Sequence, residues 1–356
     1  MKPTHVILAL AFLATSYSLN AQTNYLETVK VTDSIYVFKP KINWYLGNGI
    51  AIIGTTGVFF VDTYTSPNYA LEAINRLKKI TNLPVRYVLN THWHYDHMYG
   101  NYEFKLAFPE CEFIMHDSTY YFLKTQVKPL IDQDLELTKQ GLAQFEKERK
   151  ERKASNGLAI TDSMVPYWDQ LIEETKEVLA DYRPVKLVNG DITFNDKLTL
   201  RWGNHTLKMM HLKQYAHSEG DVIVWIPEKR LVITGDIVVA PTPYETQPNA
   251  AGMVDALQYI INMNPAIVIP GHGPVQYDLS YVKLEKEAFE AYLREAEKAV
   301  QNNIPIQEAS AYIKLDDLDY KFTKGDDLAK WAYRSYFRGH IISQVYRKHN
   351  AIPKKN

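Results

Sequence analysis

Three histidines and one aspartate fall within six consecutive positions of the stretch THWHYDH, residues 91–97. This stretch directly follows the apolar run Val85–Leu89, which predicts a buried strand. Imidazoles and a carboxylate at the end of a buried strand are costly to desolvate unless a partner compensates them. The chain must therefore fold so that the end of this strand meets an ion or polar groups that satisfy the cluster.

A metal ion is the partner that suits this spacing best. His92 and His94 are separated by one residue, so in an extended loop both can reach one ion. Asp96 and His97 follow directly and can reach a second ion, and zinc accepts both imidazole nitrogen and carboxylate oxygen. The alternative is a surface cluster held by hydrogen bonds alone, which so dense a set of ligand types after a buried strand disfavours.

The rest of the chain has the pattern of a mixed α/β protein. Strands, among them a hairpin turning at residues 55–57, surround a helix predicted over Pro67–Ile80. A helical stretch of about 120–182 interrupts the strands, which return from Val185 and end in the segment PAIVIPGHGPV. Each candidate site residue stands where a predicted strand ends, which is where α/β proteins place ligands.

Five spaced pieces together resemble the metallo-β-lactamase superfamily, over most of residues 30–275. They are Asp62 at the end of VFFVD, the cluster THWHYDH, His217 in AHSEGD, Asp236 in ITGD and His272 in PGHG. The resemblance implies an α/β fold of four layers, an αββα sandwich with the metal site at one edge. The predicted helical insertion and a helical C-terminal extension lie outside the matching part.

The resemblance also implies two zinc ions per chain and their ligands. His92, His94 and His217 would bind the first ion, and Asp96, His97 and His272 the second. Asp236 stands where much of the family has a carboxylate that bridges both ions, and where one group of β-lactamases has a cysteine. Asp62 would orient a ligand loop without touching metal.

Other residues compete for these roles. His211 is a rival to His217, and Asp236 could instead cap a turn. Trp93 and Tyr95, between the ligands, are expected to wall the site rather than do chemistry. The histidines that match no motif are expected to be ordinary hydrogen-bonded or surface residues: His116, His205, His340 and His349.

The ligand set predicts an enzyme, a metal-dependent hydrolase. Two divalent ions lower the pKa of a bridging water toward about 7, so that hydroxide attacks without a Ser or Cys nucleophile. Asp96 would be catalytic, orienting the nucleophile and passing its proton on. No G-x-S-x-G elbow is present. β-Lactam or lactone ring opening is the leading candidate; a phosphodiesterase, a non-haem iron oxygenase and a binding protein that kept the fold are alternatives.

Residues 1–21 resemble a secretory signal peptide, with cleavage after Ala21 and a periplasmic or secreted protein as the result. The apolar run Val6–Ala14 is too short for stable membrane insertion. The metallo-β-lactamase-like domain would then span 22–277 and the helical extension 278–356. A formal net charge of -1 argues against a nucleic-acid partner, and export together with this charge leaves a small-molecule substrate as the expectation. Cys111, the single cysteine, is expected to be buried.

Two segments are expected to shape the substrate pocket. The insertion would form a helical lid near the metal edge, with Tyr121, Phe122, Val165 and Trp168 facing the pocket. A helical pair packed on an outer face is the alternative. The loop of residues 40–48 would supply an apolar flap through Trp44, Tyr45 and Leu46, as the corresponding hairpin does in lactamases of the family.

Overall fold

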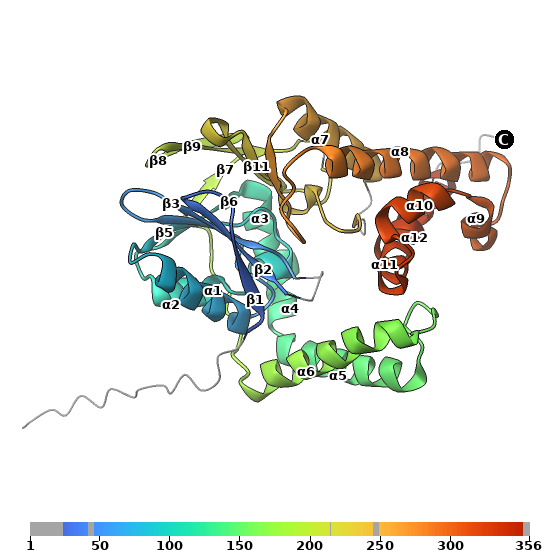
Figure 1. Cartoon of the computed structure of the whole chain (residues 1–356), viewed down its shortest axis with the longest axis horizontal. Coiled ribbons are helices and arrows are strands. Elements are labelled where there is room, and N and C mark those ends of the chain that lie inside the picture. The colour runs from blue at the N-terminus through green and yellow to red at the C-terminus, as the bar shows by residue number, and fades with distance from the viewer. Residues whose placement is uncertain (1–23, 42–45, 214, 245–248, 352–356) are drawn as a thin grey trace, which may run out of the picture.

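The computed structural model describes residues 24–41, 46–213, 215–244 and 249–351. Two β-sheets lie face to face in it, and helices cover both outer faces (Figure 1). The predicted four-layer α/β sandwich, with further helices around it, is therefore confirmed. The expected signal peptide, and Trp44 and Tyr45 of the expected flap, lie outside the described residues.

The first sheet has seven strands in chain order. They are β1 (Leu26–Lys30), β2 (Ile35–Pro40), β3 (Gly49–Ile53), β4 (Val58–Val61), β5 (Val85–Leu89), β6 (Glu112–His116) and β7 (Ile192–Phe194). Strands β1 to β4 run antiparallel, and the predicted hairpin joins β3 to β4. From β4 to β7 the pairing is parallel, so the carboxyl ends of these strands meet at one edge.

The second sheet has five strands in the order β12-β11-β10-β9-β8. They are β8 (Lys197–Trp202), β9 (His205–His211), β10 (Val222–Ile226), β11 (Leu231–Ile233) and β12 (Ile267–Ile269). Strands β8 to β11 pair antiparallel, whereas β11 and β12 are parallel. The loops that follow β11 and β12 carry Asp236 and His272 to the edge where β5 ends.

The alternation of side chains along the strands explains the layers. In β4, Phe59 and Val61 enter the core between the sheets, whereas Val58 and Phe60 face the helices on the outer side. All four are fully buried, because successive residues of a strand point to opposite faces and both faces are covered here.

Two pairs of helices cover the sandwich. Helices α1 (Pro67–Ile80) and α2 (Asn101–Ala107) lie on the first sheet, and α7 (Ala250–Met263) and α8 (Ser280–Gln301) on the second. The sequence predicted α1 with its observed bounds but missed α7 between two loops. The side chain of Asn249 marks the start of α7 by accepting a hydrogen bond from the Gly252 backbone N–H at 3.1 Å.

The remaining helices form two groups outside the sandwich. The insertion group consists of α3 (Asp117–Phe122), a π-helical turn (Leu123–Val127), α4 (Lys128–Ile131), α5 (Asp134–Glu151) and α6 (Val165–Ala180). The C-terminal group consists of α9 (Ile306–Tyr312), α10 (Asp316–Thr323), α11 (Asp327–Tyr333), a π-helical turn (Arg334–Arg338) and α12 (Gly339–Ala351). Figure 1 shows α5 and α6 below α11, and Trp168 of α6 meets Trp331 of α11 with ring centroids 5.0 Å apart.

Cys111 is fully buried, as expected, and burial raises the pKa of its thiol to about 12. A thiol with so high a pKa is a structural side chain and not a nucleophile at neutral pH. In the described part of the chain, no helix combines the length and the apolar character that crossing a membrane requires.

Candidate metal centre

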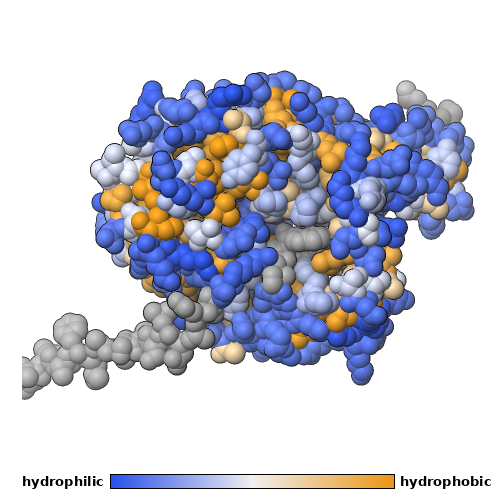
Figure 2. Space-filling model, in the orientation of Figure 1, coloured by the Kyte–Doolittle hydropathy of each residue, from blue (hydrophilic) through white to orange (hydrophobic). Residues whose placement is uncertain are grey.

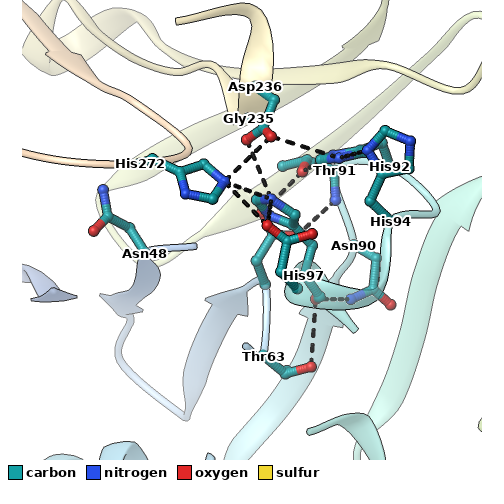
Figure 3. Close-up of polar contacts among 12 residues, drawn as sticks. Asn48, Thr63, Asn90, Thr91, His92, His94, His97, Gly235, Asp236 and His272 are labelled. Atoms are coloured by element: carbon teal, nitrogen blue, oxygen red, sulfur yellow. Dashed lines mark hydrogen bonds and ion pairs between the residues drawn. The ribbon is translucent and has the colours of Figure 1, made fainter. Parts of the chain in front are cut away.

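All seven predicted ligand residues lie at one edge of the sandwich, where strands of both sheets end; Figure 3 labels His92, His94, His97, Asp236 and His272 among them. The loop after β5 and its short 3-10 turn (Tyr95–His97) supply four of them, from the first sheet. His217 comes from the loop between β9 and β10, and Asp236 and His272 follow β11 and β12 of the second sheet. The side chains fall into two groups, each positioned to bind a metal ion: His92, His94 and His217, and Asp96, His97, Asp236 and His272.

The first group consists of three imidazoles whose nitrogens converge. His94 Nδ1 lies 3.0 Å from His92 Nε2 and 2.8 Å from His217 Nε2. Three ligands that bind zinc through nitrogen at about 2.05 Å in tetrahedral geometry would have nitrogens roughly 3.3 Å apart. The nitrogens are therefore slightly closer together than in an occupied zinc site, and imidazole nitrogens are donor atoms that zinc accepts.

The second group mixes two imidazoles with two carboxylates. His272 Nε2 lies 3.2 Å from both Asp96 Oδ2 and Asp236 Oδ2, and His97 Nε2 lies 3.1 Å from Asp236 Oδ1. Asp236 also faces the first group, since its Oδ2 is 3.5 Å from His217 Nε2. Its carboxylate therefore lies between the two groups, which is where a bridging ligand would be required.

The donor chemistry of both groups fits metal ions. Asp236 Oδ1 is buried and makes no hydrogen bond, although a buried carboxylate oxygen is costly to leave unsatisfied. In the first group, His94 Nδ1 lies within hydrogen-bond distance of two other imidazole nitrogens, His92 Nε2 and His217 Nε2. A cation in each group would satisfy the lone pairs that these side chains direct toward one another.

The pKa values of the histidines separate the two groups. Burial lowers the pKa of His94 and of His217 to about 4, and that of His92 well below its usual range. All three imidazoles are therefore neutral at pH 7, the form that binds metal. For His272 burial acts in the same direction, but the carboxylates of Asp236 and Asp96 outweigh it and raise its pKa to about 10. Protons compete with metal for the second group in particular.

Asp62 orients the ligand loop through hydrogen bonds, as predicted. Its Oδ2 accepts a hydrogen bond from His97 Nδ1 at 2.9 Å, which orients the His97 ring with Nε2 toward the second group. Its Oδ1 accepts from the Thr91 backbone N–H at 2.8 Å, and Thr91 Oγ1 lies 3.0 Å from His92 Nδ1. One carboxylate thus orients a ligand in each group.

Three supporting residues escaped the sequence analysis. Asn48 donates from Nδ2 to the carbonyls of Pro270 and Gly273, at 3.0 and 2.9 Å, and so joins the first sheet to the loop of His272. Asp221 Oδ2 accepts the His217 backbone N–H at 2.8 Å; its place in AHSEGD was the available signal. Gly271 leaves room for Asp236, because a Cβ there would lie 2.0 Å from Asp236 Oδ1.

The rival histidines belong to neither group. His211 stacks on His116 with ring centroids 3.8 Å apart, and its Nδ1 lies 3.0 Å from the Asp221 carbonyl oxygen. His116 Nε2 lies 2.8 Å from the Asn195 carbonyl, and His205 Nε2 lies 2.7 Å from Ser34 Oγ. His340 and His349 are on α12, in the C-terminal group.

A cavity of about 650 Å³ opens beside the metal edge, between the sandwich, α5, α6 and α11. Tyr95 lines it and is 49% exposed, so it walls the site as expected. Trp93 does not line it, because its ring stacks on Phe122 at 5.3 Å. Of the four insertion residues expected at the pocket, Trp168 alone is among the described residues that line this cavity; Leu46 of the expected flap also lines it.

Comparisons with known proteins agree with this geometry. The family model described as "Metallo-beta-lactamase superfamily" matches residues 42–272. The sequence has no significant match among curated proteins.

Solved structures similar to the model include the sec-alkyl sulfatase PisA1, in a double mutant, with a TM-score of 0.66 and 14% identity over 91% of this chain and 50% of that one. This chain thus spans about half the length of the sulfatase. A metallo-beta-lactamase from Pontibacter korlensis has a TM-score of 0.52 and 15% identity over 74% of this chain and 99% of that one.

Proposed function

Because the chain belongs to the metallo-beta-lactamase superfamily, we propose that it is a two-zinc hydrolase of a small molecule. The observation that supports this most directly is the position of Asp236, whose carboxylate faces both ligand groups. One group offers three neutral imidazoles and the other adds carboxylates, and zinc accepts both kinds of donor.

Bound zinc would supply a hydroxide nucleophile near neutral pH and polarise the bond to be cleaved. The residues of this chain do the remaining work. Asp96 is 9% exposed and directly follows Tyr95, which lines the cavity, so it can orient the attacking water and accept its proton. Asp62 keeps His97 in one tautomer, and the aromatic walls reduce the access of bulk water to the ligand groups.

The leading substrates are small cyclic amides and esters, a β-lactam or a lactone, because a strained or activated ring needs little positioning beyond the two ions. A sec-alkyl sulfate ester is a second candidate. The similarity to the sulfatase extends over 91% of this chain, beyond the stretch that the family model matches. At 14% identity this likeness concerns the fold, so the substrate has to be tested.

We further propose that residues 1–21 direct export and that the mature enzyme begins at Gln22 and acts outside the cytoplasm. Its partner would be a small-molecule substrate and not a nucleic acid.

The experiment is a hydrolysis screen of the zinc-loaded mature protein. The substrates are a chromogenic cephalosporin, a γ-lactone, a secondary alkyl sulfate and a phosphodiester. We expect opening of at least one ring type, with modest rates for the lactam, and loss of activity after chelation. Asp96→Ala should lower kcat by about 100-fold or more while the fold is retained.

Hydrolysis of the phosphodiester alone would replace this proposal with the phosphoesterase branch of the family. Iron found in protein purified without added metal, together with oxygen consumption, would support the oxygenase alternative.

A further inference from the structure

The cavity beside the metal edge is built by parts of the chain that the hydrolase chemistry does not use. Side chains from α1, α5, α6 and α11 line it together with Tyr95, Tyr99 and Tyr244. Its volume of about 650 Å³ lies within the range of sites that hold ligands of drug size.

Two residues that line the cavity are neighbours of the ligand groups. Tyr95 stands between His94 and Asp96, one from each group, and lines the cavity. On the other side, the ring of Tyr244 lies 6.0 Å from that of His217 and stacks on Tyr336 at 5.7 Å. A molecule whose reacting bond lies at the ligand groups would therefore extend into this cavity.

The lining has a marked chemical bias. Eight aromatic side chains and several aliphatic ones contribute, and none of the described residues that line it is a Lys, Arg or His. Three carboxyl groups line it: Asp134, Glu148 and Glu174. Such a lining attracts apolar groups and cations, the latter through aromatic faces and carboxylates, and repels anions.

Neutral donors, not cations, hold these carboxyl groups. Glu148 is 6% exposed and accepts hydrogen bonds from Trp168 Nε1 at 3.0 Å and from the Ser155 backbone N–H at 2.9 Å. Glu174 accepts from the Tyr69 hydroxyl at 2.9 Å. Within the described ranges, neither glutamate nor Asp134 forms an ion pair with a Lys or Arg, so their charge is not cancelled locally.

We propose that this cavity binds the part of the substrate that lies away from the cleaved bond, and that this part is an elongated alkyl or aryl tail without an anionic end. The inference rests on the proposed hydrolase function of the adjoining site and adds a substrate class to it. A tail that ends in a cation is accepted at least as well as a neutral one, and a tail that ends in a carboxylate is rejected.

Binding is measured by calorimetry on the zinc-loaded mature protein with three probes of equal length: decanol, decyltrimethylammonium and decanoate. We expect the first two to bind at least about tenfold more tightly than decanoate. In turnover, kcat/KM for γ-decalactone should exceed that for γ-valerolactone about tenfold or more, because the longer chain buries additional methylenes.

Two variants make the test specific to the cavity. Leu137 on α5 lines the cavity and is 41% exposed, so Leu137→Lys is compatible with folding and should reverse the order of decanoate and decyltrimethylammonium. Trp331→Ala should weaken all three probes. Tyr320→Ala is the matched control, since Tyr320 is an aromatic residue of the C-terminal group, 58% exposed and outside the described lining.

The two proposals can fail separately. Probe binding in the expected order, without hydrolysis of any substrate in the screen, would overturn the hydrolase and leave the cavity's preference standing. The inference about the tail would be overturned if the rate of hydrolysis did not depend on tail length and the probes either failed to bind or bound to Leu137→Lys in the same order as to the wild type.

Discussion

Neighbouring histidines at the metal edge have different roles, and the groups that each ring contacts explain the difference. His211 and His217 are both near strand β9, yet only His217 directs a ring nitrogen at another ligand, 2.8 Å from His94 Nδ1. His211 instead stacks on His116. Asp221 serves both: its carboxylate holds the His217 backbone, and its carbonyl oxygen lies within hydrogen-bond distance of the His211 ring.

Metal content tests this division. We expect about two zinc ions in the wild-type chain and about one in His217→Ala, because two imidazoles retain zinc poorly. His211→Ala should retain both ions, since it removes no ligand. The measurement is elemental analysis after zinc loading and gel filtration, and a pattern opposite to this one would transfer the ligand role to His211.

At the scale of elements, the seven candidate ligand residues could be named from the sequence because each stands in a short motif of the family that the chain resembles. His92 to His97 follow one buried strand, and the structure brings them together with His217, Asp236 and His272. The cavity could not be predicted in the same way. Trp331 on α11 and Tyr336 in the π-helical turn that follows it line the cavity. They lie more than 200 residues beyond the cluster of residues 92–97, and no sequence motif near them indicates this contact.

Helix α8 is another element to which the sequence analysis assigned no role. Tyr281 donates from its hydroxyl to the Val239 carbonyl at 2.6 Å, just after the loop of Asp236. One turn further, Glu285 is fully buried, and its Oε1 lies 3.4 Å from the Val239 backbone N–H that donates to it. Burial raises the pKa of Glu285 well above the ordinary 4.5, so the carboxyl is protonated in the folded protein over a range of pH in which it is ionised in the unfolded chain.

This difference predicts how stability changes with pH. A carboxyl whose pKa is raised by folding contributes its stability below 4.5 and loses it as pH rises through the folded pKa. Glu285→Gln cannot ionise, so we expect its Tm relative to wild type to increase as pH is raised from 6 to 9. Glu290→Gln on the same helix is the control, since Glu290 is an exposed residue paired with Lys286. A constant difference across that range would contradict the buried protonated carboxyl.

In the whole molecule, the insertion and the C-terminal helices close a ring around the cavity. Their contact has its own apolar cluster, which includes Trp168, Leu171, Trp331 and Ala332 and is separate from the core between the sheets. Thr161 and Ser163 add hydrogen bonds to Asp327, at 2.9 and 3.1 Å. Because the two cores do not merge, the ring can open while the sandwich stays folded.

Trp168→Ala should open that ring. The loss of a buried tryptophan costs about 3–5 kcal/mol, here within the apolar cluster that joins the insertion to the C-terminal helices. By hydrogen exchange we expect faster exchange in α5, α6 and α11 and unchanged exchange in the strands. Tyr121→Ala, at a 64% exposed position of the insertion, should change neither. Equal acceleration in the strands would mean that ring and sandwich unfold as one unit.

The distribution of the ligand residues over both sheets determines when metal can bind during synthesis of the chain. His92, His94 and His97 emerge early in synthesis, but the first group lacks its third imidazole until His217 follows, and the second lacks its last until His272. The first group is complete only when about three fifths of the sequence has been made and the second only after about three quarters, so tight metal uptake has to wait until then. Once bound, each ion would act as a cross-link between segments more than 120 residues apart, stabilising the closed sandwich by about 2.7 kcal/mol at a free concentration of 100 times its Kd.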